Sequence, residues 1–345
     1  MLLIKQPASR SASPAILIIW AFGLPISNAQ TFALTDATAL VPVNVKAAVA
    51  EYKGRKAVLI TRDATKPGEK FKDGFALLKG VDFQDGTIEG EIALKITAPP
   101  GAPRMPGFVG IAFRARPDAS RYELFYLRPG NSTSEDQAMR NHSVQYTSEP
   151  DNGWYKLRRQ WPWVYEAWAE LKTETWTKVK IEVNGRSARL FVNGSEQPSL
   201  VVDGLKGEDL RGGIALWGYP EEEAYFSNFH VVSSPPAPVK NGSEAAGSWQ
   251  LTIRELANFQ GTLQLKRDGN KLAGDWSGAV GKAHGVAGTW RNGYIELSFD
   301  AEWGNPENPR ITPTFLAGWI DGDAASGRMS VKDVVDGHWT AVRKP

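Results

Sequence analysis

The sequence predicts an all-β protein, with an N-terminal two-sheet jelly-roll sandwich followed by a small antiparallel up-and-down β-barrel. Three observations support this prediction. Apolar residues recur at every second position in many short runs, and no long stretch has the 3.6-residue period of an amphipathic helix. Turns rich in Gly and Asn separate the runs at short intervals, which is typical of sandwiches and barrels. A single Pro/Ser/Gly-rich break divides the chain into two such β regions.

The first β region contains the clearest strand patterns. Between 87 and 96, apolar residues and one glycine occupy the even positions, which predicts a strand with one buried face. Residues 178–183 alternate in the same way. Asn184-Gly185 then supplies the positive φ angles of a tight hairpin that returns along 188–192. Further strands are expected at 56–61, 108–114, 121–128, 142–147, 213–217 and 224–232.

The second β region is a meander of hairpins. Its turns are expected at Asp268-Gly269, Asn292-Gly293 and near Asp321-Gly322, and Asp336-Gly337 precedes the final run HWTAVRK. An up-and-down barrel would close such a meander and leave no free strand edges. Side chains fill small barrels of this kind, and this region holds six tryptophans that could do so. They are Trp249, Trp276, Trp290, Trp303, Trp319 and Trp339.

The chain divides into four segments. Lys5 and Arg10 precede an apolar run too short to span a bilayer, and Ser27-Asn28-Ala29 follows it. This pattern predicts a secretory signal peptide at 1–29, cleaved before Gln30, and hence a periplasmic or extracellular protein. The β-sandwich is expected at 30–232, a Pro/Ser/Gly linker at 233–247 and the barrel at 248–345.

Charge and cysteine content exclude several classes of protein. The chain has 40 basic and 38 acidic residues, and loss of the signal peptide would balance the two. Without a basic excess to neutralise phosphates, a nucleic-acid partner is not expected. The absence of cysteine excludes disulfides, thiolate nucleophiles and Cys-based zinc sites. No apolar stretch after the signal is long enough for a transmembrane helix.

Motifs for metals, cofactors and catalysis are largely missing. The four histidines lack metal-ligand spacing, and no phosphate-binding glycine loop occurs, so neither a metal nor a cofactor is expected. Sandwich glucanases place carboxylates on one strand as Glu-x-Asp-x-x-Glu. Here Glu149-Pro150-Asp151 is the one Glu-x-Asp, and it lies in a loop. Glu89 and Glu91 resemble a solvated strand face. Glu123 and Glu166 are therefore the candidate general acid and base, provided that their strands bring them together.

A set of ligand-binding candidates is distributed over neighbouring strands. Arg114 is expected to share an open strand face with two small residues, and Tyr126, Arg128 and Gln145 follow on the next strands. Arg provides a fork of donors, and aromatic rings provide flat apolar faces for sugar C–H groups. The alternative is that these residues form ordinary cross-strand pairs on an exposed sheet.

The run QWPWVYEAW at 160–168 belongs to a long excursion between two sandwich strands, where function often lies. Pro162 excludes a central strand because it lacks an amide donor. Trp161 and Trp168 are expected to be buried anchors of the excursion. Trp163 and Tyr165 are expected to line a ligand groove.

Three runs carry a family resemblance: GFVGIAFRARPDASRYELFYLRPG, WTKVKIEVNGRSARLFVNGSEQPSLVVDGL and GGIALWGYPEEEAYFSNFHV. Together they resemble the concanavalin A-like lectin/glucanase superfamily, in particular its laminin-G-like and 3-keto-disaccharide hydrolase branches. The resemblance covers roughly residues 45–232 and implies a jelly roll whose concave face meets carbohydrate. The second β region resembles a calycin or streptavidin-type barrel.

Three functions remain open from the sequence. The first is a secreted, lectin-like carbohydrate-binding protein that recognises a glycan on the concave face of the sandwich. The second is a glycoside hydrolase or lyase acting on a modified (keto) sugar, although the glucanase motif is absent. The third is a structural or adhesion module that binds a protein partner. The oligomeric state stays open.

Overall fold

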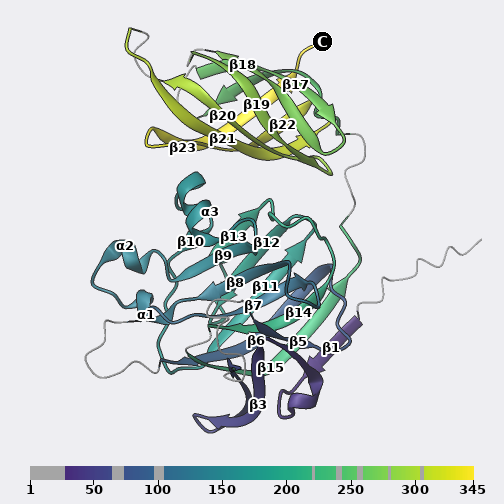
Figure 1. The fold of residues 1–345 in the computed structure, drawn as a ribbon, viewed down its shortest axis with the longest axis vertical. Coiled ribbons are helices and arrows are strands. Elements are labelled where there is room, and N and C mark those ends of the chain that lie inside the picture. The colour runs from purple at the N-terminus through teal and green to yellow at the C-terminus, as the bar shows by residue number, and fades with distance from the viewer. Residues whose placement is uncertain are drawn as a thin grey trace, which may run out of the picture.

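The computed structural model describes residues 28–63, 74–96, 105–219, 222–237, 243–254, 259–278, 281–303 and 307–345. Strands dominate these residues, in two antiparallel sheets and one closed barrel, so the all-β prediction is confirmed. Figure 1 shows the barrel at one end of the sandwich. Most of the proposed signal peptide, residues 1–27, lies outside the described residues. The expected cleavage point before Gln30 falls inside strand β1.

The larger sheet of the sandwich has eight strands in the order β13-β12-β11-β6-β15-β4-β3, with β1 also paired to β15. Period-two alternation holds on β11, whose odd-numbered valines and isoleucine point into the core. The strands are β1 (Asn28–Phe32), β3 (Val45–Tyr52), β4 (Arg55–Arg62), β6 (Asp85–Lys95), β11 (Thr177–Asn184), β12 (Ser187–Val192), β13 (Leu200–Asp203) and β15 (Glu223–Ser234).

The smaller sheet has seven strands in the order β10-β9-β8-β7-β14-β5-β2. Three short helices and one 3-10 turn accompany the two sheets. The strands are β2 (Leu40–Val43), β5 (Phe75–Leu78), β7 (Val109–Ala115), β8 (Tyr122–Leu127), β9 (Val144–Glu149), β10 (Glu166–Ala167) and β14 (Gly213–Gly218). The helices are α1 (Pro129–Ser132), α2 (Gln137–Arg140) and α3 (Trp154–Gln160), and the 3-10 turn is Ala37–Ala39.

The two sheets enclose one apolar core. Ile88 and Ile92 of the larger sheet belong to the same buried cluster as Phe113 and Phe125 of the smaller one. Each fully buried side chain of this size contributes about 1.5–3 kcal/mol to folding. The smaller sheet carries a second apolar layer on its other face, which includes Tyr126 and Trp217.

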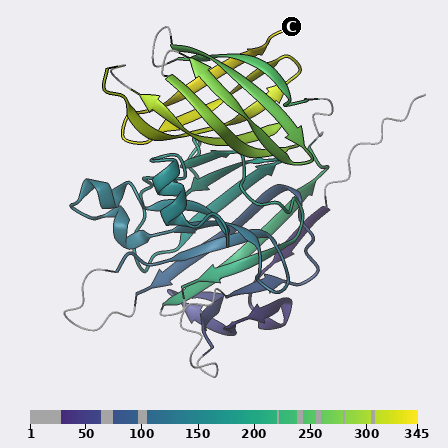
Figure 2. The ribbon, with the colours of Figure 1, turned by 45° about the horizontal axis from the view of Figure 1, so that its top comes forward.

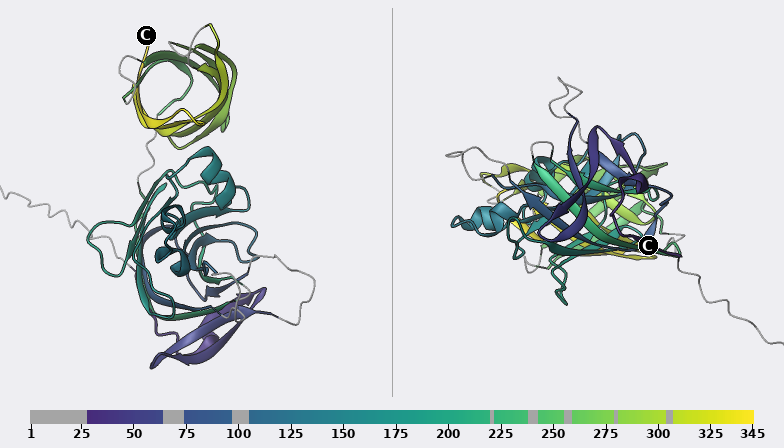
Figure 3. Two further views of the ribbon diagram at one scale, coloured as in Figure 1. Left: turned by 90° about the vertical axis from the view of Figure 1, so that its left-hand side faces the viewer. Right: turned by 90° about the horizontal axis from the view of Figure 1, so that it is seen from below.

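The barrel has eight strands that pair in chain order, and its first strand pairs with its last (Figure 3, left). A buried cluster that includes four of the six tryptophans fills it, while Trp290 packs against that cluster and Trp319 packs against the core of the sandwich. The strands are β16 (Gly247–Ile253), β17 (Phe259–Asp268), β18 (Lys271–Gly278), β19 (Gly281–Arg291), β20 (Tyr294–Trp303), β21 (Arg310–Asp321), β22 (Ala324–Val331) and β23 (Val335–Arg343).

The barrel lies directly against the sandwich (Figure 2). Tyr294 of β20 is buried in the sandwich core cluster, and its hydroxyl donates to the carbonyl of Asp203 at 3.4 Å. The buried ammonium of Lys206 pairs with the carboxylate of Glu296 on the barrel. The parts of the chain described contain no helix long and apolar enough to span a membrane.

Candidate functional site

Arg114 does not lie on the open strand face where the sequence places it. It has a φ of +49°, and the pairing of β7 with β14 shifts register beside it. The backbone therefore turns the side chain toward the opposite sheet. There the guanidinium donates to the carboxylate of Asp85 at 2.9 Å and to the carbonyls of Gln84 and Gly185. With 1% of its surface exposed, Arg114 is held between the two sheets, at the border of a polar hollow that Glu123 also lines.

Glu123 is also an interior residue. Its carboxylate accepts a hydrogen bond from the Tyr146 hydroxyl at 2.5 Å and another from the Gly207 amide at 2.8 Å. Burial raises the pKa of Glu123, and the Tyr146 hydrogen bond and the charge of Arg114 oppose this rise. The carboxylate borders a polar hollow of about 250 Å³ next to the barrel.

Glu123 and Glu166 cannot act as an acid–base pair across one sugar bond. On β8, Glu123 points the same way as Phe125 of the core, and Tyr126 points to the other face. Tyr126 lies opposite Gln145, which lies opposite Glu166. The two carboxylates therefore lie on opposite faces of the same sheet, and the expectation that they come together is wrong.

Five of the predicted residues do come together, around Glu166. Arg128 donates to the Tyr126 hydroxyl at 2.9 Å and to the side-chain carbonyl of Gln145. Arg158 of α3 donates two hydrogen bonds of 2.7 Å to the Glu166 carboxylate. The Nδ1 atom of His142 lies 2.8 Å from the same carboxylate. We call these residues, with Trp163, the Glu166 network.

The Glu166 network is buried except at Trp163 and at the partly exposed Arg158. Tyr126, Arg128, Gln145 and Glu166 each expose 5% or less of their surface. Trp163 is 58% exposed and lies parallel to the His142 ring, with the ring centroids 5.6 Å apart. The network thus fastens the excursion to the concave sheet, and it presents one aromatic face. His142 and Arg158 were not identified from the sequence, because no local spacing links them to Glu166.

The aromatic residues of QWPWVYEAW separate into two groups. Trp161 is buried, as expected for an anchor, and Tyr165 is also buried and packs against Tyr146. Trp168 is 52% exposed, so its assignment as a buried anchor is wrong. β10 is an edge strand that ends at Ala167, so Trp168 has no paired neighbour to cover it.

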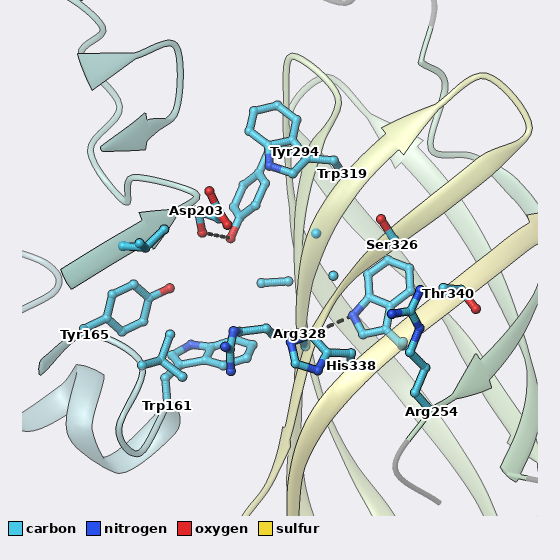
Figure 4. A pocket seen from close by; sticks show the side chains of 16 residues that line it. Trp161, Tyr165, Asp203, Arg254, Tyr294, Trp319, Ser326, Arg328, His338 and Thr340 are labelled. Atoms are coloured by element: carbon cyan, nitrogen blue, oxygen red, sulfur yellow. Dashed lines mark hydrogen bonds between the residues drawn. The ribbon is translucent and has the colours of Figure 1, made fainter. Parts of the chain in front are cut away.

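The interdomain groove is a cavity of about 340 Å³ between the sandwich and the barrel. Figure 4 shows its two walls, with Arg328 pointing from the barrel toward the sandwich. The sandwich wall comprises Trp161, Val164, Tyr165, Val201 and Asp203. The barrel wall comprises Arg254, Tyr294, Ala317, Gly318, Trp319, Ser326, Gly327, Arg328, His338, Trp339 and Thr340.

A second hollow of about 470 Å³ follows the groove along the β22–β23 hairpin. Arg328 and His338 form one cross-strand pair and line the groove, while Ser330 and Asp336, the next pair but one, line the second hollow. Trp163 lines this hollow from the sandwich side. The segment from Trp161 to Tyr165 thus borders both cavities.

Metal ligation has no support in the described residues, where no group of three or more His, Asp or Glu side chains could hold an ion. The polar groups that line the groove are hydroxyl, guanidinium, imidazole and one carboxylate. Their chemistry suits hydrogen bonding to a bound molecule.

No protein-family model and no curated protein sequence matches the chain. Among solved structures it is similar to carbohydrate binding module CBM66 from Bacillus subtilis, with 15% identity over 55% of this chain and 96% of that chain, at a TM-score of 0.35. A Bacillus subtilis protein with a galectin-like fold covers 62% of this chain and all of its own length, with 10% identity and a TM-score of 0.39. A Clostridium perfringens endo-β-galactosidase that releases GlcNAcα1-4Gal covers 96% of this chain and 100% of its own, with 10% identity and a TM-score of 0.34. Scores this low assign no function to the chain, so function is argued from the groove.

Proposed function

We propose that this protein is an exported carbohydrate-binding protein whose ligand lies in the interdomain groove. The observation that carries the proposal is the composition of the two walls. Trp161 and Trp319 bring aromatic side chains from opposite sides, and Ser326, Thr340 and Asp203 bring hydrogen-bonding groups between them. Sugars need this combination, because their C–H faces pack on rings while their hydroxyls need polar partners.

The concave face of the sandwich supports the proposal less well than the groove does. Phe75, Trp217, Tyr126 and Gln145 form a cross-strand row over that face, and none of them lines the groove or the second hollow. Tyr165 is the ligand-binding candidate from the sequence that lines the groove, and Trp163 lines the adjoining hollow. The proposed site therefore lies at the end of the sandwich that meets the barrel.

The second hollow bears on the length of the ligand. Because both cavities lie along one hairpin, a chain of several sugars could pass from Trp319 in the groove toward Trp163 in the hollow. The cavity volume of the groove alone is at the lower end of the range for ligand sites.

A glycan array followed by calorimetry tests the proposal. We expect residues 30–345 to bind at least one oligosaccharide, and Trp319→Ala to weaken that binding about tenfold or more because a stacking face is lost. Trp168→Ala removes an equally large, exposed indole outside the groove and should leave binding unchanged. Thermal unfolding of both variants checks that the fold is retained. Absence of binding to every glycan, or equal binding by both variants, contradicts the proposal.

A further inference from the structure

We infer that the glycan in the interdomain groove is acidic, with carboxylate or sulfate groups held separately by Arg254 and by Arg328, which flank His338 on the barrel wall. The inference rests on the proposed function and adds the chemical class of the ligand. Both arginines belong to the barrel wall: Arg254 directly follows β16, and Arg328 lies on β22.

The two guanidinium groups are unused within the protein. In the part of the chain that the structure describes, neither Arg254 nor Arg328 has a hydrogen-bond, ion-pair or ring partner for its side chain. Arg114, Arg128 and Arg158, by contrast, each engage several acceptors. A planar guanidinium matches a two-oxygen anion with paired hydrogen bonds, so each of the two guanidinium groups on this wall can hold one anionic group.

The balance of charge in the groove points the same way. Among the described residues that line it, Asp203 is the single acidic one, and its carboxylate accepts a hydrogen bond from Ser187 at 3.1 Å. Glu296 lies behind the wall, and its carboxylate forms ion pairs with Lys206 and Arg291. Two arginines against one carboxylate leave a positive groove, which attracts anionic ligands.

The second hollow does not extend this positive field. Arg158, Arg159 and Lys332 line it, but the charge of Arg158 is paired with Glu166, and Asp333 and Asp336 line the hollow as well. The anionic groups of the ligand are therefore assigned to the groove, and neutral parts of the chain to the hollow.

Three probes of matched length separate the possibilities: a polygalacturonate fragment, a sulfated dextran fragment and a neutral galactan fragment. We expect at least one acidic probe to bind about tenfold or more tightly than the galactan, and added salt to weaken that binding. Arg254→Gln and Arg328→Gln should each remove most of this preference. Arg310→Gln, which removes an exposed charge at the start of β21 and away from the groove-lining residues 317–319, should keep it.

The outcomes are distinguishable. Equal affinity for acidic and neutral probes overturns the inference and leaves carbohydrate binding intact. Binding to no probe and to no array glycan overturns the proposed function as well. Equal losses with Arg310→Gln show a general charge effect and overturn the inference. Preference for polygalacturonate or for sulfated dextran identifies the anion as carboxylate or sulfate.

Discussion

His142 shows how one side chain of the Glu166 network responds to its neighbours. Burial lowers the pKa of its imidazole below the ordinary value of 6.5. The charge of Glu166 on β10 opposes this change, while Arg158 on α3 and Arg128 after β8 add to it. The imidazole therefore stays neutral in the folded protein at a pH where a free histidine is already partly protonated.

This shift predicts a dependence of stability on pH. As the pH falls through about 6.5, His142 gains a proton in the unfolded chain before it does so in the folded one, so the free energy of unfolding decreases. His142→Gln should reduce the loss of stability between about pH 7 and pH 5, as measured by urea unfolding followed through tryptophan fluorescence. An identical loss in the variant and the parent would show that the folded pKa of His142 is not depressed.

At the scale of elements, the turn after β13 determines how closely the barrel approaches. Gly204 has a φ of +88°, and a Cβ atom there would lie 1.9 Å from the Tyr294 ring of β20. The position thus requires glycine for two reasons, the left-handed backbone and the close contact. Tyr294 enters the sandwich core because this position lacks a side chain.

The two reasons can be separated by substitution. Gly194 has a φ of +76° with no atom within 4 Å of its ideal Cβ, so Gly194→Ala introduces backbone strain alone. We expect it to cost about 1 kcal/mol, and Gly204→Ala to cost clearly more because Tyr294 must move. Thermal unfolding gives the first quantity, and small-angle X-ray scattering shows whether Gly204→Ala separates the barrel from the sandwich. Equal costs for the two variants would mean that Tyr294 does not depend on Gly204.

At the scale of the whole molecule, one buried ion pair links the two folded parts. Lys206 exposes 4% of its side chain, and its ammonium lies over the rings of Trp161 and Tyr165 as well as against Glu296. Burial is the largest single effect on the pKa of Lys206 and lowers it, but the charges of Glu296, Tyr165 and Tyr294 and the hydrogen bond to Glu296 together outweigh burial, so the pKa is raised. The lysine is therefore charged at neutral pH.

Removal of one partner should loosen the junction. Glu296→Gln leaves a buried, uncompensated ammonium, and we expect a loss of about 3–5 kcal/mol. Lys206→Met combined with Glu296→Leu should lose much less, because no charge is then left buried. Asp323→Asn breaks a largely exposed pair with Arg343 and should cost less than about 1 kcal/mol. Chemical unfolding of the three variants measures these changes, and a cost for Glu296→Gln as small as that for Asp323→Asn would argue against the buried pair.

Much of the fold could be predicted from the sequence, because alternation and turn residues act locally. The hairpin through Asn184-Gly185 is an example. The position of the Arg114 side chain could not be predicted, because the bulge at Arg114 depends on the pairing of β7 with β14, a strand about one hundred residues later. Alternation along β8 does predict that Glu123 and Tyr126 point to opposite faces of the sheet. The strand register that places Glu166 beside Gln145, however, cannot be predicted from local sequence. The groove is even harder to predict from local sequence patterns, because Trp161 and Arg328 belong to different domains and come together only when the two domains dock.

The order of strands in the sandwich has a consequence for its synthesis on the ribosome. β15 lies between β6 and β4, and β14 lies between β7 and β5. Until residues 213–234 emerge, each sheet is therefore two separate groups of hairpins with unpaired edges facing each other. The nascent chain must carry these exposed edges through most of its translation, and β14 and β15 then join all four groups almost at once. Until then these edges are open to mispairing, and the barrel, which starts at Gly247, can form only afterwards.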